Sequence, residues 1–325
     1  MKVGIIGGGV WGSALAKLLS NNKVLLFARD VKTVKSINDN RFNPKLKYVI
    51  FNDNVTATED ISILNDSDYL FIALPSQNIR EVLSKFKSSN ANLQIIIASK
   101  GIEIKTLDLL SKVVKDVTSC KNISVLSGPC FSDEVSQNLP TAVTFASNNR
   151  KSFEEVSTLF NKRNFRIYYS DDIVGCQIGG ALKNIYAIGA GITLGLNLGE
   201  NAKSAFITRS FVEIIRFGKA LGANEKTIFG LSGLGDLILT CSSVKSRNTK
   251  FGQLISTISL PNIEDILRSQ EVTEGYFTLS AVKKIADQKK IDMPIATSIY
   301  NILYNKYAIK DEINNLLERP SSDEF

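Results

Sequence analysis

The chain has 325 residues, 44% of them hydrophobic and 22% charged, which is enough for two domains with their own cores and excludes a largely disordered protein. It contains no histidine, which excludes imidazole as a catalyst and as a metal ligand. Its 39 basic and 32 acidic residues give a formal net charge of +7, but the lysines are scattered and form no basic stripe. We therefore expect no nucleic-acid partner, and either compositional bias or an anionic ligand would explain the charge.

Cysteine usage and hydropathy indicate where the protein works. The four cysteines are Cys120, Cys130, Cys176 and Cys241. Their wide spacing excludes a zinc ribbon and a dense disulfide framework. The apolar start, 1–19, is interrupted by glycines, unlike a signal peptide, and the uncharged segment 184–199 is too short for a spanning helix. We expect a cytoplasmic protein with no metal centre and no membrane span. A homodimer is compatible with the sequence, which does not fix the oligomeric state.

Short β-branched runs alternate with helical stretches through about residue 170. The runs span 2–6, 23–27, 69–74, 94–99, 123–126, 141–146 and 165–169. Continuous apolar runs of this length are typical of buried parallel strands, and right-handed crossovers between them predict a doubly wound, Rossmann-type α/β sheet. From Asp172 onward the periodicity is helical. We therefore predict one domain at 1–170 and a second, helical domain at 171–325.

A glycine-rich turn follows the first of these runs. Gly7, Gly9 and Gly12 match G-x-G-x-x-G between a predicted strand and an amphipathic helix. Gly7 would allow the tight turn, Gly9 would let backbone amides approach a pyrophosphate, and Gly12 would let the helix lie close to the strand. The N-terminus of the helix adds unpaired N–H groups and a partial positive charge. The pattern predicts dinucleotide binding by the first domain.

Two further positions in the first half bear on the ligand. The second run ends at Arg29 and Asp30, where an acid would bond the ribose 2′-hydroxyl of NADH and an arginine would meet the 2′-phosphate of NADPH. Arg29 is nearer the strand end, which slightly favours NADPH, and a solvated ion pair is the alternative. Lys100 follows the run 94–99 at the carboxyl edge of the sheet, where such folds bind ligands. A solvated lysine would also explain it.

A lysine in the second half has the features of a proton donor. Hydride exchange with a secondary alcohol needs a group that exchanges the hydroxyl proton, and without histidine lysine is the leading candidate. Lys183 follows Gly179 and Gly180 in a predicted helix, so its side chain would lie over bare backbone and leave room for a ligand. Poor solvation there would lower its pKa toward the catalytic range. A surface lysine on a tightly packed helix is the alternative.

Two polar motifs follow this lysine. A glycine-rich turn delivers Asp236, which can orient the lysine or a substrate hydroxyl. Ser246, Arg247 and Asn248 combine a planar guanidinium with short hydrogen-bonding side chains, which suits a phosphorylated small-molecule substrate. An exposed polar loop would explain the same residues.

Taken together, these motifs resemble the bacterial-type NAD(P)-dependent sn-glycerol-3-phosphate dehydrogenase family, from the first strand to about residue 310. They are GGGVWGSALA at 7–16, SKGIE at 99–103, SGPCFSDEV at 127–135, GGALKNIYAIGAG at 179–191, NAKSAFITRS at 201–210, GLSGLGDLILTC at 230–241, SRN at 246–248 and VTEG at 272–275. The resemblance implies a helical second domain. It also implies NAD(P)H-dependent reduction of dihydroxyacetone phosphate to glycerol 3-phosphate for phospholipid synthesis.

The resemblance also implies residue roles, with Lys183 as the catalytic lysine. Substrate-holding positions are occupied here by Lys100, Gly128, Cys130, Lys183, Asp236, Ser246, Arg247 and Asn248. Cofactor-contacting positions are occupied by Trp11, Arg29, Lys100, Ser132, Arg247, Val272 and Glu274. Cys130 stands where the family usually has Ser or Thr, and Ser132 where Ala is common. A thiol donates hydrogen bonds weakly, so we expect little from the side chain of Cys130.

The resulting hypothesis is that hydride reaches C2 of dihydroxyacetone phosphate while protonated Lys183 supplies a proton to the developing alkoxide. The SRN motif would anchor the substrate in a cleft between the domains. One alternative is a dehydrogenase of another substrate, such as a β-hydroxyacid, which explains SRN poorly unless that substrate is phosphorylated. The other is a nucleotide-sensing module without turnover, which has no need of Lys183 and Asp236.

Overall fold

The computed structural model describes residues 1–325 except 47–48, 161–162, 258–272, 321–322 and 324–325. Its internal contacts divide the chain into two compact units. Unit 1 comprises Met1–Lys100 and Leu109–Ile173, and unit 2 comprises Gly101–Asp108 and Val174–Phe325. The chain therefore passes from one unit to the other three times, because eight residues inside the first half belong to unit 2. The change in periodicity near residue 170 carries no signal for this excursion.

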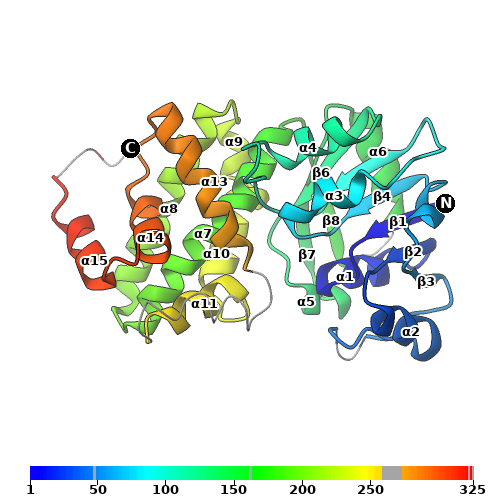
Figure 1. The fold of residues 1–325 in the computed structure, drawn as a ribbon, viewed down its shortest axis with the longest axis horizontal. Helices are drawn as coiled ribbons and strands as arrows, with labels where there is room; N and C mark the ends of the chain where they lie inside the picture. The colour runs from blue at the N-terminus through cyan, green and yellow to red at the C-terminus, as the bar shows by residue number, and fades with distance from the viewer. Residues whose placement is uncertain (47–48, 161–162, 258–272, 321–322, 324–325) are drawn as a thin grey trace. The chain divides into compact units, whose positions relative to one another are not determined.

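Unit 1 is built on one eight-stranded sheet of order β3-β2-β1-β4-β5-β6-β7-β8 (Figure 1). The strands are β1 Lys2–Ile6, β2 Lys23–Phe27, β3 Val55–Thr58, β4 Tyr69–Ile72, β5 Gln94–Ile97, β6 Asn122–Ser127, β7 Thr141–Ala146 and β8 Phe165–Ser170. β1 pairs in parallel with both β2 and β4, so the chain reverses its direction of travel across the sheet at this strand. The predicted Rossmann-type fold is confirmed.

Two features of the sheet differ from the prediction. The sequence gives no clear signal for β3, since its four residues include two threonines and its side chains alternate between buried and less buried. The expectation of parallel strands throughout is wrong for β7, which pairs antiparallel with β6, placing Leu126 opposite Phe145. The short connection between these strands contains the five-residue helix α5, Ser132–Ser136. It leaves the sheet at the end of β6 and re-enters at the same end as β7, so the two strands run in opposite directions.

The central strands of the sheet, β1, β4 and β5, are buried on both faces, whereas β3 and β8 at its two ends are partly exposed. One core cluster joins alternate strand residues such as Val3, Ile5 and Phe71 to side chains of the flanking helices. Residues of the opposite parity, such as Leu70 and Ile95, are equally inaccessible. The helices of unit 1 are α1 Val10–Leu18, α2 Val31–Asn40, α3 Ile79–Leu83, α4 Leu110–Val117, α5 and α6 Arg150–Leu159, with 3₁₀ turns at Ile61–Leu64 and Ser76–Asn78. Burial on both faces explains why the central strands are almost continuously apolar.

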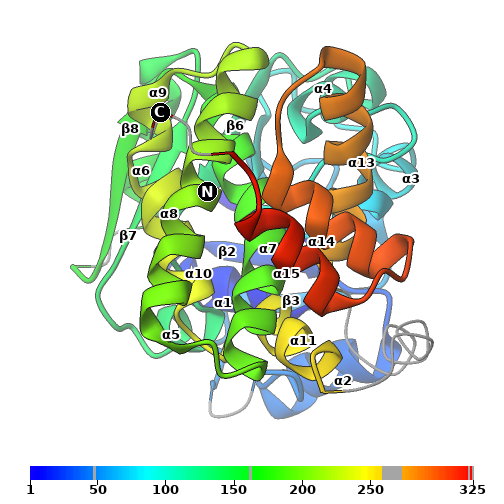
Figure 2. The same cartoon turned by 90° about the vertical axis from the view of Figure 1, so that its left-hand side faces the viewer.

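Regular structure in the described part of unit 2 is helical, as predicted. The helices are α7 Ile173–Gly195, α8 Gly199–Ala220, α9 Glu225–Ile228, α10 Asp236–Cys241, α11 Arg247–Ile255, α13 Glu274–Lys289, α14 Pro294–Tyr304 and α15 Ile309–Leu317. A π-helical turn, η3 Leu231–Gly235, precedes α10. α7 lies among α8, α10, α11 and α14 (Figure 2), and all of its residues from Gly175 to Thr193 are buried. In the described residues, no helix is both long and apolar enough to cross a membrane.

Candidate active site

The glycine-rich turn of unit 1 has the conformation that the sequence predicts. Gly7 adopts a φ of +125°, and a Cβ on it would lie 2.4 Å from the carbonyl oxygen of Ala73. A Cβ on Gly12 would lie 1.8 Å from the carbonyl oxygen of Gly7, so α1 can approach the turn only with glycine at this position. Gly9, at the N-cap of α1, differs because a Cβ there would meet no other described residue within 4 Å beyond its chain neighbours. The open space beside Gly9 is where the N-terminus of α1 can receive a phosphate group.

The two charged residues after β2 have different surroundings. Asp30 is the N-cap of α2, and its carboxylate accepts hydrogen bonds from the Lys32 backbone N–H at 3.2 Å and from the Thr33 hydroxyl at 2.6 Å. The hydroxyl of Thr33 is the main cause that lowers the pKa of Asp30. Arg29 is exposed at the end of the strand. Both carboxylate oxygens of Asp30 are therefore engaged at the start of α2, whereas Arg29 is exposed.

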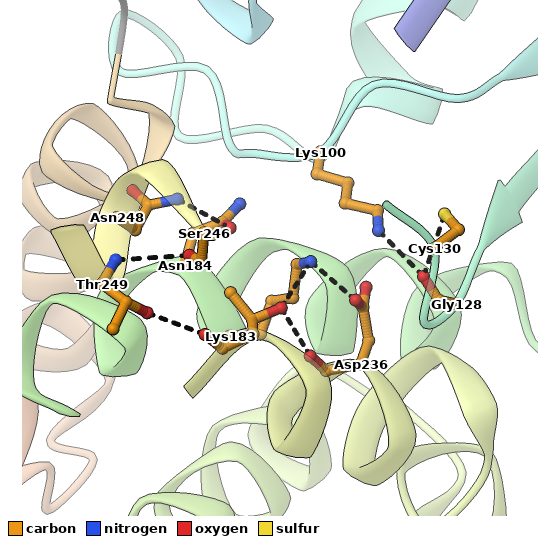
Figure 3. A network of polar contacts seen from close by, with 10 residues as sticks. Lys100, Gly128, Cys130, Lys183, Asn184, Asp236, Ser246, Asn248 and Thr249 are labelled. Atoms are coloured by element: carbon orange, nitrogen blue, oxygen red, sulfur yellow. Dashed lines mark hydrogen bonds and ion pairs between the residues drawn. The ribbon is translucent and has the colours of Figure 1, made fainter. Parts of the chain in front are cut away.

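Two loops at the carboxyl edge of the sheet are joined by a lysine. Lys100 follows β5, and its Nζ donates to the carbonyl oxygen of Gly128, which follows β6, at 3.2 Å (Figure 3). The thiol of Cys130 donates to the same carbonyl at 3.3 Å. Gly128 has a φ of +154°, and a Cβ there would lie 2.9 Å from the Cα of Val143. Nearby, the indole Nε1 of Trp11 donates to the Ala98 carbonyl at 3.1 Å.

Lys183 is buried in unit 2 and held by two oxygen atoms. Its Nζ lies 2.6 Å from Oδ1 of Asp236 and donates to Oγ1 of Thr240 at 2.8 Å (Figure 3 shows the Asp236 contact). The lysine is 8% exposed and the aspartate 0%. Burying a charge is costly unless it is paired and hydrogen-bonded, and this ammonium has both kinds of partner. The site therefore holds a cation with one fixed orientation on α7.

The space beside Gly179 is not open. A Cβ on this residue would lie 2.4 Å from the carbonyl oxygen of Ser232 and 2.7 Å from the Cα of Gly233. The expectation that this glycine leaves room for a ligand is therefore wrong, because backbone of the η3 turn fills the gap. Gly179 instead allows α7 and η3 to come close, which brings Asp236 at the start of α10 within reach of Lys183.

The SRN motif forms the N-terminus of α11. Ser246 is the N-cap, and its hydroxyl accepts from the backbone N–H of Thr249 at 3.3 Å. Arg247 is the first helical residue and is exposed. Asn248 is buried, and its Nδ2 donates to Oδ1 of Asn184 at 3.0 Å (Figure 3) while its Oδ1 accepts from the N–H of Gly275 at 3.0 Å. The motif thus places an arginine at a helix N-terminus beside a fixed amide.

The remaining predicted residues divide between the units. Glu274 begins α13, one residue before the Gly275 amide that bonds Asn248. Ser132 begins α5 in unit 1 and is half-buried. Val272 lies outside the described residues. Within unit 2, therefore, Lys183 pairs with Asp236, and Asn248 bonds Gly275, the residue after Glu274.

Comparison with known proteins identifies the family. Residues 2–153 match the family model described as the N-terminus of NAD-dependent glycerol-3-phosphate dehydrogenase, and residues 172–314 match the corresponding C-terminal model. The chain belongs to this family. A relative from Novosphingobium aromaticivorans, named glycerol-3-phosphate dehydrogenase [NAD(P)+], is 40% identical over 99% of this chain and 98% of its own length. A relative of the same name from a Thermotoga species is also 40% identical, over 100% of this chain and 99% of its own length.

Solved structures agree with this membership. The crystal structure of glycerol-3-phosphate dehydrogenase from Coxiella burnetii matches with a TM-score of 0.91 and 32% identity, covering 98% of this chain and 99% of that one. A Plasmodium falciparum glycerol-3-phosphate dehydrogenase matches with a TM-score of 0.89 and 26% identity, covering 99% and 97%. The resemblance to the dehydrogenase family that the sequence motifs indicate is confirmed.

Sequence reasoning missed Thr240, which contacts the predicted proton donor. Thr240 contacts Lys183, and its hydroxyl also donates to the carbonyl of Asp236 at 2.6 Å. The available signal is its position four residues after Asp236, since side chains at i and i+4 share a helix face. In the part of the chain that the structure describes, no cluster of three His, Cys, Asp or Glu side chains is arranged to hold a metal ion.

Proposed function

We propose that this protein catalyses the NAD(P)-dependent interconversion of dihydroxyacetone phosphate and sn-glycerol 3-phosphate, in the cytoplasm and in support of phospholipid synthesis. The observation that carries the proposal is the buried ammonium of Lys183, fixed by Asp236 and Thr240, in a chain of the glycerol-3-phosphate dehydrogenase family. The relatives are named as dehydrogenases of glycerol 3-phosphate that use NAD(P)+. We propose a homodimer as the assembly, which light scattering of the purified protein tests against a monomer.

The glycine-rich turn fits a dinucleotide. The open space at Gly9 and the N-terminus of α1 suit a pyrophosphate, which supports a cofactor site in the segment 1–170. The residues proposed to hold the cofactor are Gly7, Gly9, Trp11, Gly12, Arg29, Lys100, Ser132, Arg247, Val272 and Glu274. When bound, NAD(P)H supplies the hydride for reduction. We assign substrate binding and proton transfer to the segment 171–325, with Lys100, Gly128 and Cys130 contributing from the first segment.

Lys183 is proposed to hold and transfer the proton. In reduction, its ammonium donates to the oxygen on C2 of dihydroxyacetone phosphate as that oxygen gains negative charge, and in oxidation the neutral amine takes the proton back. Asp236 stabilises the charged form and, with Thr240, fixes the direction of the amine. A preset donor orientation avoids reorganisation during the reaction.

The phosphate of the substrate is proposed to bind at the N-terminus of α11. Arg247 offers a planar set of donors, and the first N–H groups of the helix point toward an anion placed there. Ser246 and Asn248 would add hydrogen bonds. Asn248 is oriented by Asn184 and Gly275, so its amide has little freedom before a ligand arrives.

Removal of the ammonium tests the assignment of Lys183. In Lys183→Ala we expect kcat for dihydroxyacetone phosphate reduction to fall by about 10²–10⁴, the usual contribution of a general acid, while the Kd for NADPH stays unchanged. The loss of NADPH absorbance measures kcat, and fluorescence titration measures the Kd for NADPH. The matched control is Lys219→Ala, which removes a lysine of unit 2 that pairs with Glu225 on the surface. Near-normal turnover by Lys183→Ala would reject the proposal.

Arg29 is proposed to favour NADPH, because Asp30 is engaged as a helix cap. In Arg29→Gln we expect the KM for NADPH to rise by about tenfold, the value of one charge-assisted hydrogen bond, with the KM for NADH little changed. Steady-state kinetics with each cofactor measures both. Lys32→Gln, which removes an exposed positive charge three residues away, is the control. An equal rise for both cofactors would contradict a contact with the 2′-phosphate.

A further inference from the structure

Asn43 makes an unusual set of contacts with the glycine-rich turn. It lies three residues after the end of α2 and is 0% exposed. Its Nδ2 donates to the carbonyl oxygen of Gly8 at 3.0 Å and to the hydroxyl oxygen of Ser13 at 2.6 Å. Its Oδ1 accepts from the backbone N–H of Lys45 at 2.9 Å. One buried side chain, 35 residues away in sequence, thus holds both the turn and the first turns of α1.

The amide of Asn43 can be oriented in only one way. The Lys45 partner is a backbone N–H, which only donates, so it must face the amide oxygen. The Gly8 partner is a carbonyl, which only accepts, so it must face the amide nitrogen. Both amide hydrogens and the oxygen are therefore committed, and an alternative rotamer would break three contacts at once.

The contact at Gly8 has a consequence for Gly9. The carbonyl of Gly8 and the N–H of Gly9 belong to one planar trans peptide, in which they point in opposite directions. Fixing the carbonyl toward Asn43 therefore aims the Gly9 N–H away from Asn43. On its other side Gly8 packs closely against Ala28, since a Cβ on Gly8 would lie 2.3 Å from the Ala28 Cβ. The peptide is clamped and cannot rotate freely.

We propose that Asn43 is a positioning residue for cofactor binding: by holding the Gly8–Gly9 peptide and Ser13, it aims backbone N–H groups at the pyrophosphate. The inference rests on the proposed role of the turn as the dinucleotide site. Three consecutive glycines have more conformational freedom to lose than any other tripeptide, so an unclamped turn would lose that entropy when the ligand binds. Asn43 orders the turn during folding instead, which leaves more of the binding energy for affinity.

Two substitutions of Asn43 test the clamp. Asn43→Ala removes all three contacts, whereas Asn43→Asp keeps the acceptor for the Lys45 N–H and loses both amide hydrogens. Its second carboxylate oxygen can accept from the Ser13 hydroxyl if that hydroxyl turns, but it faces the Gly8 carbonyl oxygen without a hydrogen between them. We expect the Kd of NADPH and of NADH to rise together, by about tenfold or more, because both cofactors share the pyrophosphate. Fluorescence titration on protein shown to be folded measures both. We expect kcat at saturating cofactor to stay close to that of the unmodified protein.

A matched variant separates positioning from stability. Asn38 also makes two hydrogen bonds through its amide, to the N–H and carbonyl of Ala57 on β3. Asn38→Ala should lower the melting temperature without changing either Kd. Hydrogen exchange of the segment 7–13 in the absence of cofactor should be faster in both Asn43 variants and unchanged in Asn38→Ala. Unmodified affinity in Asn43→Asp, or equal loss of affinity in Asn38→Ala, would overturn the proposal.

Gly9→Ala distinguishes failure of this inference from failure of the site itself. Among the residues that the structure describes, and apart from its chain neighbours, a methyl group at Gly9 would meet no atom within 4 Å. The backbone there has a φ of −77°, so the variant should fold normally. It would occupy space proposed for the pyrophosphate and should weaken both cofactors. If Gly9→Ala weakens binding and the Asn43 variants do not, the role of Asn43 is wrong and the site stands. If Gly9→Ala binds normally, the dinucleotide site is misplaced and the role of Asn43 is overturned with it.

Discussion

Thr240 shows how one hydroxyl group links three parts of unit 2. Its Oγ1 accepts from Lys183 on α7 and donates to the carbonyl of Asp236 one helical turn earlier. Its own carbonyl accepts from the hydroxyl of Thr249 on α11 at 2.7 Å. Thr240 therefore connects the ammonium of Lys183, the backbone of Asp236 and the helix α11. A small movement of α10 would shift all three.

Loss of this hydroxyl should affect chemistry more than binding. In Thr240→Val we expect kcat to fall by about tenfold, because Lys183 keeps its charge partner but loses the contact that fixes its direction. The Kd of NADPH should not change. The control is Thr193→Val, since Thr193 is a buried threonine of α7 whose hydroxyl donates to the carbonyl of Gly189 in the same helix. Equal kcat values for the two variants would contradict the role of Thr240.

At the scale of single residues, the sequence indicates which side chains are candidates but does not show what fills the space around them. The absence of histidine and the position of Lys183 among glycines single out this lysine, which the structure finds buried and paired, and its part in proton transfer stays a prediction. The same reasoning fails for Gly179, because sequence does not tell whether a ligand or another backbone segment fills the space beside a glycine. Thr240 is missed although it lies inside the motif at 230–241, because nothing in the sequence distinguishes its hydroxyl from that of an ordinary helical threonine.

At the scale of elements, one buried carboxyl group joins three helices. Glu213 of α8 accepts hydrogen bonds from the N–H of Ile295 at 2.6 Å and of Ala296 at 3.0 Å, in the first turn of α14. Tyr186 of α7 donates to it at 3.0 Å. Burial raises the pKa of Glu213 to about 7, although these three hydrogen bonds act in the opposite direction. The N-cap residue of α14 makes no side-chain hydrogen bond to the helix, which begins with Pro294. The carboxyl group of Glu213 therefore acts as the cap for the first N–H groups of α14.

This group makes stability depend on pH. In the native state Glu213 keeps its proton up to a pH of about 7, whereas the unfolded chain releases that proton near pH 4.5. The contribution of Glu213 to the free energy of unfolding is therefore full below pH 4.5 and is lost as the pH rises to about 7. The loss amounts to about 3 kcal/mol in the free energy of unfolding. Urea unfolding between pH 4.5 and 8 should show this slope in the unmodified protein and in the exposed control Glu200→Gln. Glu213→Gln should lack it, and an unchanged slope there would refute the assignment.

The strands show what hydrophobic pattern can and cannot predict. Runs such as 2–6 and 23–27 are recovered in full because strands buried on both faces must be apolar throughout. The direction of β7 is not predictable in this way, since a run of apolar residues reads the same for either direction of the chain. The short connection through α5 decides it, and that depends on packing which no local pattern records.

At the scale of the whole molecule, the two units are interleaved along the chain. Unfolding of unit 1 would release both ends of Gly101–Asp108, which belongs to unit 2, so we expect the units to unfold together. The single tryptophan, Trp11, lies in unit 1, whereas most helical residues lie in unit 2. Tryptophan fluorescence and far-ultraviolet circular dichroism should therefore give the same urea midpoint. Two separate midpoints would show that the units are independent.

The same excursion affects how the protein can be made. When Ile173 has left the ribosome, every strand of the sheet has been synthesised, yet Gly101–Asp108 still lacks the rest of unit 2. The nascent first half would carry eight residues without their final neighbours until the later helices emerge. A gene cut at this natural-looking boundary would leave that segment permanently without them, so fragments for biophysical work should be designed around the excursion.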